Sequence, residues 1–406
     1  MVVFARLFLP RTTAVCAGVV FAILPRVTWA GVEGRSYAFT ALAAVWLTVL
    51  LVTAIRRNRW WLWLLYAVTL LLSILLNIYL VLLVPTYAVV TPLLGRRRKS
   101  VVLWWAITSA VAVGAMTPLI LFAHGQSFAV AWITRLNWHT VLDVVQHQYF
   151  DNSVPFAIVV ALIFVAALTI RLTGRWASAG DTRRLLIICA AWMVVPTAIS
   201  LIYSAFEPLY CPRYLFFTTP AMAVVLAVCI VTVARKPRWI AMVLIVLVAA
   251  AIPNYALSQR QRYAKEGWDY SDVADVITAH AGPGDCLLVD NTVSWVPGPI
   301  RALLAARPAA YRPLVDVGRG QRAPERGTLW DGHVAVWLVV GRLYQCSTLW
   351  TISNHDTTLS VHQSGKSLPP GKVLGRAPAY LTPKLVGFRI VERWQFHRSQ
   401  VIKSVR

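Results

Sequence analysis

Nine runs of mostly apolar residues follow one another over the first 256 positions, and each is about as long as a bilayer-crossing helix. A bilayer core about 30 Å thick is crossed by a helix of about 20 residues. The runs lie at 12–30, 38–55, 60–76, 78–95, 101–123, 154–170, 185–205, 214–233 and 239–256, the third and fourth being divided at Asn77. Because the chain is also 58% hydrophobic and only 14% charged, it is too apolar for an ordinary water-soluble domain. The sequence predicts a mostly α-helical, polytopic membrane protein with about nine transmembrane helices.

The composition changes after residue 256. Residues 1–256 contain 20 Lys and Arg but only 5 Asp and Glu, whereas residues 257–406 contain 19 and 11 and many more polar residues. We therefore expect a transmembrane domain at 1–256 and a small water-exposed α/β domain at 257–406. In the second domain the patterns predict helices at 270–282 and 299–306, strands at 286–290 and 335–340, and a final hairpin of 389–396 with 399–406.

The basic residues predict how the helices are oriented, because Lys and Arg collect in cytoplasmic loops. With nine spans, sixteen of the twenty Lys and Arg residues in 1–256 fall on the same side of the membrane as the N-terminus. They are Arg6, Arg11, Arg56, Arg57, Arg59, Arg96, Arg97, Arg98, Lys99, Arg171, Arg175, Arg183, Arg184, Arg235, Lys236 and Arg238. We expect a multi-pass protein of the bacterial plasma membrane, in contact with membrane lipids, with a cytoplasmic N-terminus and an exoplasmic C-terminal domain. The net charge of +23 is then largely a topology signal, and no nucleic-acid partner is expected. A cleaved signal peptide at 1–30 is an alternative that Pro25 and Arg26 disfavour.

Most acids of the first domain fall on the predicted exoplasmic side, with four basic residues. The set is Arg26, Arg35, Arg135 and Arg213, with Glu33, Asp143, Asp151 and Glu207. For Arg26, Asp151 and Glu207 we expect ordinary loop charges that form weak surface pairs. Glu33, Arg35 and Arg213 instead lie in very short turns between long apolar runs, where ionisable groups tend to mark a reaction centre. Arginine binds phosphate through two parallel hydrogen bonds, and a carboxylate can orient it or accept a hydroxyl proton, so this face suits a lipid-phosphate substrate.

The loop at 124–153 is long enough for a short amphipathic helix on the membrane surface. His139, Asp143 and His147 recur every four residues on one face of that helix. Three ligands on one helix lie too far apart along its axis to meet one ion, so interfacial packing with substrate contacts is favoured over a metal site, and a divalent metal cofactor is left open. Cys286 and Cys346 both fall in the second domain, and whether they form a disulfide is also left open.

Several local motifs resemble those of one family. EGRSYAF at 33–39 is similar to an acidic-x-Arg-x-Tyr motif, and CPRYLFFTTPAMAVVLA from residue 211 is similar to an Arg-Tyr-Leu-x-x-x-x-Pro motif. The second domain resembles an actinobacterial branch through WDYSDVADVI, GPGDCLLVD, VWLVVG and a closing motif at Gly387, Phe388 and Trp394. The family is that of bacterial polytopic glycosyltransferases of the C-type fold, in the superfamily of polyprenyl-phosphate-mannose mannosyltransferases and aminoarabinose transferases.

The resemblance implies transfer of a mannose-like sugar from a polyprenyl-phosphate donor to a hydroxyl of an exoplasmic glycan, lipid or protein. It implies that Arg35 and Arg213 contact the donor phosphate and that Glu33 orients Arg35 or contacts the sugar. Tyr37 and Tyr214 lie within the motifs and are further substrate-site candidates. Arg135, His139 and Asp143 are candidates of second rank for the donor or the acceptor.

One departure from the family matters for catalysis. Its members carry a catalytic carboxylate in an exoplasmic loop after a first span, and neither precedes EGRSY here. We therefore expect a chain that lacks the N-terminal first span and the catalytic loop, in which no residue inherits the role of base. Two alternatives to a glycosyltransferase follow: a lipid or glycolipid transporter or flippase, and a catalytically inactive membrane assembly protein.

Overall fold

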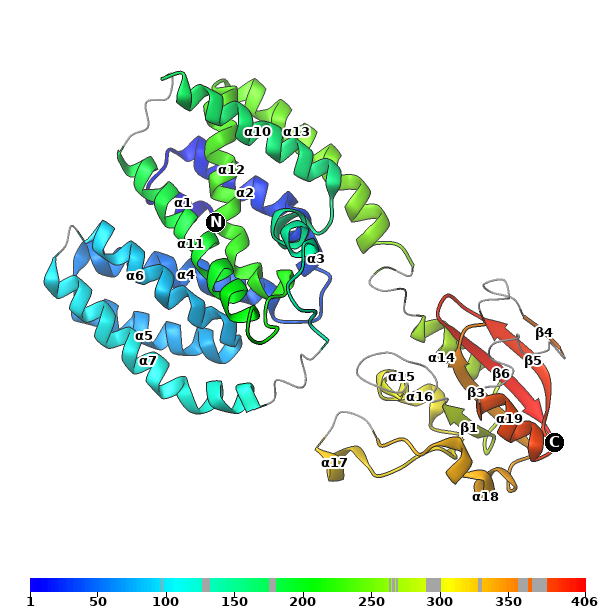
Figure 1. Ribbon diagram of the computed structural model, residues 1–406. Helices are drawn as coiled ribbons and strands as arrows, with labels where there is room; N and C mark the ends of the chain where they lie inside the picture. The colour runs from blue at the N-terminus through cyan, green and yellow to red at the C-terminus, as the bar shows by residue number, and fades with distance from the viewer. Residues whose placement is uncertain are drawn as a thin grey trace. The chain divides into compact units, whose positions relative to one another are not determined.

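The computed structural model describes residues 1–95, 98–125, 132–174, 180–262, 264, 267, 269–289, 301–327, 331–356, 364–366 and 378–406. Of the positions named above, residues 96, 97, 126–131, 175, 268, 290 and 299–300 lie outside these ranges. The chain divides into two compact units, Met1–Arg260 and Gln261–Arg406 (Figure 1).

The regular secondary structure among the described residues of the first unit is all helical. Its elements are α1 (Val2–Arg6), α2 (Arg11–Ile23), α3 (Pro25–Ala30), α4 (Tyr37–Arg57), α5 (Trp60–Leu76), the 3-10 helix η1 (Ile78–Leu82), α6 (Leu83–Leu94), α7 (Lys99–Gly125), α8 (His139–Leu142), the π-helix η3 (Asp143–His147), α9 (Gln148–Phe150), α10 (Val154–Leu172), α11 (Gly180–Ser204), the 3-10 helix η4 (Pro212–Thr218), α12 (Thr219–Ala234), α13 (Pro237–Asn254) and the π-helix η5 (Tyr255–Gln259).

Among the described residues, six helical segments are long and apolar enough to cross a membrane. They are Tyr37–Arg57, Lys99–Gly125, Val154–Leu172, Gly180–Ser204, Pro212–Ala234 and Pro237–Gln259. The three remaining apolar runs form the shorter helices Arg11–Ile23, Trp60–Leu76 and Ile78–Leu94. The prediction of a mostly helical, membrane-embedded protein is therefore confirmed at this level.

The apolar run at 60–95 breaks where the sequence predicts. Asn77 has an extended backbone with φ −158° and ψ 120°, and its side-chain oxygen accepts a hydrogen bond of 3.0 Å from the Tyr79 N–H. This hydrogen bond satisfies one free donor at the start of η1, as an N-cap does. Two helices thus meet at residue 77 instead of one helix continuing.

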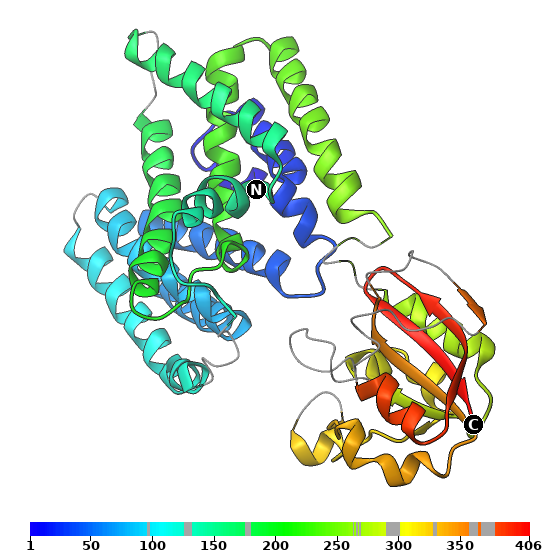
Figure 2. The same cartoon turned by 45° about the vertical axis from the view of Figure 1, so that its right-hand side comes forward.

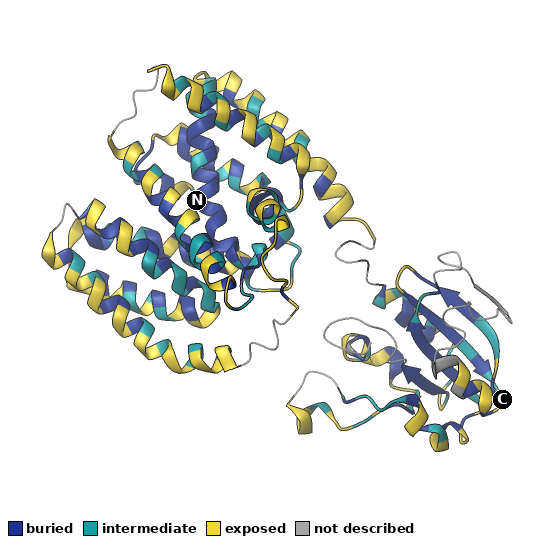
Figure 3. Ribbon diagram, viewed as in Figure 1, coloured by how far each residue is buried: buried dark blue, intermediate teal, exposed yellow. Residues whose placement is uncertain are grey.

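Helix α12 forms the centre of the first unit. Almost every residue from Thr219 to Ile230 is buried, and the ribbon of α12 is dark blue in Figure 3. Small residues such as Ala221, Ala223 and Ala227 allow α2, α10 and α11 to approach it closely. By contrast α7, α10 and α13 carry exposed Leu, Val, Ile and Trp side chains on their outer faces. A large exposed apolar surface of this kind is typical of contact with lipid.

The second unit is a small α/β domain, as predicted. Its elements are α14 (Tyr270–His280), β1 (Cys286–Val289), α15 (Ala302–Ala306), α16 (Pro308–Tyr311), β2 (Val315–Asp316), α17 (Ala323–Arg326), the 3-10 helix η6 (Val336–Leu338), α18 (Val340–Leu343), β3 (Thr348–Asn354), β4 (Ser364–Lys366), α19 (Pro378–Leu385), β5 (Arg389–Gln395) and β6 (Ser399–Val405). The strand order is β2-β1-β3-β6-β5-β4, and β1 runs parallel to β2 and β3 while the other pairs are antiparallel (Figure 2).

Both faces of this sheet are covered, which explains why all four residues of β1 are buried. Leu287 and Val289 pack with α14 in one core cluster, whereas Cys286 and Leu288 pack on the other face with Leu343. Cys286 and Cys346 form a disulfide, which resolves the question that the sequence left open.

One predicted strand of this domain is wrong. Residues 335–340 form the 3-10 helix η6 and the start of α18, and the neighbouring strand is β3, which the sequence analysis missed. The buried residues of the segment are Val336, Val339 and Leu343, three and four positions apart. That spacing is helical, and a short apolar run does not reveal its period by composition alone.

Candidate functional site

The motif residues of the sequence analysis meet at one end of the helical unit. Tyr37 begins α4, and its ring lies 6.4 Å from that of Phe216 in η4, measured between centroids. Tyr214 of η4 lies 5.0 Å from Tyr79 of η1 and 6.4 Å from Trp132 in the same measure. The turn before α4 and the turn before α12, which are far apart in the sequence, therefore form one cluster. We call Glu33, Arg35, Tyr37, Tyr79, Trp132, Cys211, Arg213 and Tyr214 the arginine cluster.

Arg213 is the most unusual member of the arginine cluster. Its guanidinium carbon lies 4.6 Å from the centre of the Trp132 ring and 5.7 Å from that of Tyr214. Its Nε atom is buried and has no hydrogen-bond partner in the part of the chain that the structure describes. Within the described ranges, no carboxylate oxygen lies within 4.0 Å of the Arg213 guanidinium. Cation–π contacts compensate part of the cost of burying this charge, and a bound anion would compensate more.

Arg35 is more exposed and is held by two neighbours. Its side chain is 59% exposed, and its Nε atom lies 3.9 Å from Glu33 Oε1, at the outer limit of an ion pair. A hydrogen bond with the Tyr37 side chain is the largest cause that raises the pKa of Arg35, and the neighbouring Glu33 charge acts in the same direction. Both Arg35 and Arg213 act electrostatically on Tyr37 and Tyr214, so the two guanidiniums border the same aromatic surface.

Cys211 lies beside Arg213 but is not an activated thiol. Burial raises the pKa of the Cys211 thiol, although the neighbouring Arg213 charge opposes that shift. A protonated, buried thiol is a poor nucleophile. The chemistry available in the cluster is therefore anion binding by arginine and hydrogen bonding by tyrosine.

Arg26 and Asp151 form a buried ion pair next to the arginine cluster, which corrects the expectation of weak surface charges. Arg26 Nη1 lies 2.8 Å from Asp151 Oδ1, and the two side chains are 8% and 15% exposed, respectively. Arg26 also donates a 3.0 Å hydrogen bond to the His147 carbonyl, and Asn254 donates one of 2.8 Å to the Asp151 carbonyl. Burial raises the pKa of Asp151, and the Arg26 charge opposes this shift. The pair is buried because α3, α9 and α13 converge here, which loop lengths do not reveal.

Among the described residues, Asp143 is the second-rank candidate that is linked to this arrangement, through His147, whose carbonyl accepts a hydrogen bond from Arg26. Arg135 and His139 are exposed, and His139 stacks on Trp138 with ring centroids 3.6 Å apart. Asp143 Oδ1 lies 3.1 Å from Nδ1 of His147, four residues later. In the part of the chain that is described, no contact joins Arg135 or His139 to Arg35 or Arg213, and no group of three or more His, Cys, Asp or Glu side chains is placed to hold a metal ion.

Sequence reasoning missed four members of these clusters. Trp132, Tyr79 and Cys211 enter through contacts between distant segments, and Asp151 enters through its partner Arg26. Only Cys211 carries a local signal, because it directly precedes the Pro-Arg-Tyr motif.

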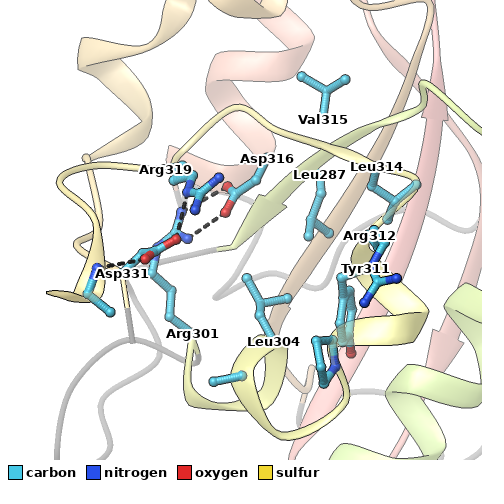
Figure 4. Close-up of a pocket in the computed structure, with 13 residues that line it drawn as sticks. Leu287, Arg301, Leu304, Tyr311, Arg312, Leu314, Val315, Asp316, Arg319 and Asp331 are labelled. Carbon is cyan, nitrogen blue, oxygen red and sulfur yellow. Dashed lines mark hydrogen bonds and ion pairs between the residues drawn. The ribbon is translucent and has the colours of Figure 1, made fainter. Parts of the chain in front are cut away.

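The second unit contains a separate cavity of about 670 Å³ (Figure 4). At one end Arg301 binds Asp316 through two hydrogen bonds of 2.5 and 2.8 Å, and Arg319 binds Asp331 at 2.6 Å. Leu287 and Leu304 line its middle. Because each of its two carboxylates already pairs with an arginine, these groups chiefly stabilise the fold around the cavity.

A scan against models of protein families finds no match, and a search of curated proteins finds no relative.

Proposed function

We propose that the protein is a membrane glycosyltransferase that transfers a mannose-like sugar from a polyprenyl-phosphate donor to a hydroxyl of a cell-envelope glycan, lipid or protein. The observation that carries this proposal is Arg213, a partly buried cation with no carboxylate beside it among the described residues, at helix ends where a lipid phosphate would lie. The resemblance of EGRSYAF and CPRYLFF to the glycosyltransferase motifs supports it independently.

The proposed roles follow from the chemistry of the step. In the transfer, the bond between the sugar and the lipid phosphate breaks, and the acceptor oxygen forms the new bond as it loses its proton. Arg213 and Arg35 stabilise the negative charge that develops on the departing phosphate. Glu33 orients Arg35, while Tyr37 and Tyr214 border the donor. We propose no residue of this chain as the general base. The proposal also leaves open whether a divalent metal ion is a cofactor.

The proposed topology has nine spans, six long and three short, with the N-terminus in the cytoplasm and the second unit on the exoplasmic face. The Cys286–Cys346 disulfide supports the exoplasmic location of the second unit, because disulfides persist in oxidising compartments and are rare in the cytosol. The site then faces an extracytoplasmic acceptor.

The test is sugar transfer by membranes that contain the Arg213→Ala or Arg35→Ala variant, with a polyprenyl-phosphate sugar as donor. We expect Arg213→Ala to reduce kcat/KM by at least about a hundredfold, the loss typical of one oxyanion-stabilising donor. Arg238→Ala is the matched control, because the Arg238 guanidinium also lies over an aromatic ring, Trp239 at 5.5 Å, but at the start of α13.

Normal transfer by both variants, with normal amounts of inserted protein, would overturn the phosphate-binding roles. If the wild-type protein transfers no sugar but moves labelled polyprenyl phosphate between leaflets, the flippase alternative replaces the enzyme.

A further inference from the structure

A hollow lined by basic residues lies at the end of the helical unit opposite the arginine cluster. Tyr37, in the arginine cluster, begins α4, and Arg56, in this hollow, lies in its last turn. With 21 residues and about 1.5 Å per residue, α4 separates the two by about 30 Å. The hollow has a volume of about 460 Å³ and is lined by Leu7, Phe8, Ile55, Arg56, Leu94, Gly95, Arg98, Asp181 and Arg184. These residues come from the ends of α1, α4 and α6 and the beginnings of α7 and α11. We call it the basic hollow.

The basic hollow carries excess positive charge. Three arginines and one aspartate line it, which gives 3 − 1 = +2. Arg184 lies 3.3 Å from Asp181, so one arginine is neutralised. Within the described ranges, neither Arg56 nor Arg98 has a carboxylate within 4.0 Å. Two guanidiniums thus border one cavity without a carboxylate at ion-pair distance among the described residues.

The Arg56 side chain is held in position for a ligand. One of its terminal nitrogens donates a 3.1 Å hydrogen bond to the Leu7 carbonyl, and its guanidinium carbon lies 4.7 Å from the centre of the Phe8 ring. A guanidinium that is already ordered loses less entropy when it forms a two-point contact with a phosphate. The N-termini of the long helices α7 and α11 also lie here, and helix N-termini favour a negative charge.

An apolar groove begins next to the basic hollow. It is formed by α6 and α7, has a volume of about 680 Å³, and is lined by Pro92, Lys99, Ser100, Val102, Leu103 and Ala106. Lys99 directly follows Arg98 in the sequence, and Leu103, one turn further along α7, is 60% exposed. A ligand that places an anion in the hollow and a hydrocarbon chain along this groove would use both features, whereas free phosphate would use only the first.

We propose that the basic hollow binds the phosphate of an anionic phospholipid whose acyl chain lies in the groove between α6 and α7. The bound lipid contacts the N-terminal ends of α7 and α11 and the C-terminal end of α4. These three helices have few direct contacts with one another and pack mainly on α5 and α6, so the lipid connects them. This site is independent of sugar transfer, because none of its residues belongs to the arginine cluster.

Native mass spectrometry of the full chain, purified in a mild detergent and titrated with phosphatidylglycerol or phosphatidylcholine, tests the proposal. We expect one tightly bound phosphatidylglycerol, weakened about fivefold by Arg98→Gln and further by Arg98→Gln with Arg56→Gln, since each arginine near an anionic lipid contributes about that factor. Arg238→Gln, which removes an equal charge at the start of α13 outside the hollow, should leave binding unchanged.

Three outcomes would overturn the proposal. The first is equal binding of the two lipids, and the second is undiminished phosphatidylglycerol binding by the double variant. The third is displacement of the lipid by millimolar inorganic phosphate, which would show a site for small anions instead. The Arg98→Gln variant should fold like the wild type, because the Arg98 side chain makes no hydrogen bond or ion pair among the described residues.

Discussion

The Arg26–Asp151 pair shows how one buried interaction supports the neighbourhood of the candidate site. Its two charges are largely removed from water, and each also interacts with the backbone or side chains of other segments. A buried pair contributes little compared with an apolar pair of equal size, but losing one partner leaves an uncompensated charge. The cost of a mutation here therefore depends on which atoms remain.

We predict that Asp151→Asn lowers the free energy of unfolding by about 3 kcal/mol, because Arg26 is left buried without its counter-ion. The double variant Arg26→Met with Asp151→Asn should recover much of that loss, because it removes the uncompensated charge and keeps a residue type that tolerates φ 48° at position 151. Chemical unfolding in detergent measures both. Asp181→Asn is the control, since it breaks the exposed pair with Arg184 and should change stability by less than about 1 kcal/mol. Equal losses in the control and in Asp151→Asn would contradict the argument.

His333 makes the second unit sensitive to acid. Burial, assisted by the Arg301 charge, lowers the pKa of His333 to about 4, and its Nδ1 atom lies 3.3 Å from Arg301 Nε. Unfolded histidine titrates near 6.5, so the unfolded chain binds the extra proton between those values. Stability is therefore complete above about pH 6.5 and decreases as the pH falls towards 4.

Replacing His333 by Gln should flatten this acid dependence. Hydrogen exchange of the second unit, followed from pH 7 to pH 4, would show less acceleration in His333→Gln than in the wild type after correction for intrinsic rates. His280→Gln serves as the control for loss of a histidine in the same unit. An unchanged slope in His333→Gln would show that other groups cause the acid sensitivity.

At the scale of elements, the sequence predicted the positions of apolar segments better than it predicted whether a short segment is a helix or a strand. Long apolar runs became helices because only helices satisfy the backbone within a run of that length in lipid. The turns before α4 and α12 could be singled out as candidate functional segments because ionisable residues there are costly. By contrast, the helical period of Val336, Val339 and Leu343 was hidden in a short run, and strand β3 was missed beside it. Trp132 and Asp151 joined the clusters through tertiary contacts that no local pattern encodes.

The disulfide between β1 and the turn after α18 should account for much of the stability of the second unit. It closes a loop with a sequence separation of 60 residues, for which chain entropy gives about 4 kcal/mol. The variant Cys286→Ser with Cys346→Ser should therefore unfold in this unit at clearly lower denaturant concentration, monitored by limited proteolysis. Cys16→Ser, in the helical unit, is the control. Equal protease resistance with and without reductant would contradict the prediction.

At the scale of the whole molecule, the proposed topology can be tested by labelling. The free cysteines, Cys16, Cys189, Cys211 and Cys229, are all buried, so the background should be low. A cysteine in place of the exposed Gln321 should react in intact cells with a membrane-impermeant thiol reagent, whereas one in place of Lys236 should react only after lysis. The reverse pattern would invert the orientation and place the arginine cluster on the cytoplasmic side.

The central position of α12 also constrains the order in which the protein can be made. Its closest partner along the bundle is α2, a short helix that leaves the ribosome about two hundred residues earlier. During synthesis α2 can pack against its sequence neighbours α1 and α3, but its most extensive native contact forms only when α12 emerges, so this part of the bundle stays incomplete until then. The core of the helical unit is therefore completed only when α12 is inserted, and nascent chains that stop before residue 219 should be recognised as unassembled and degraded.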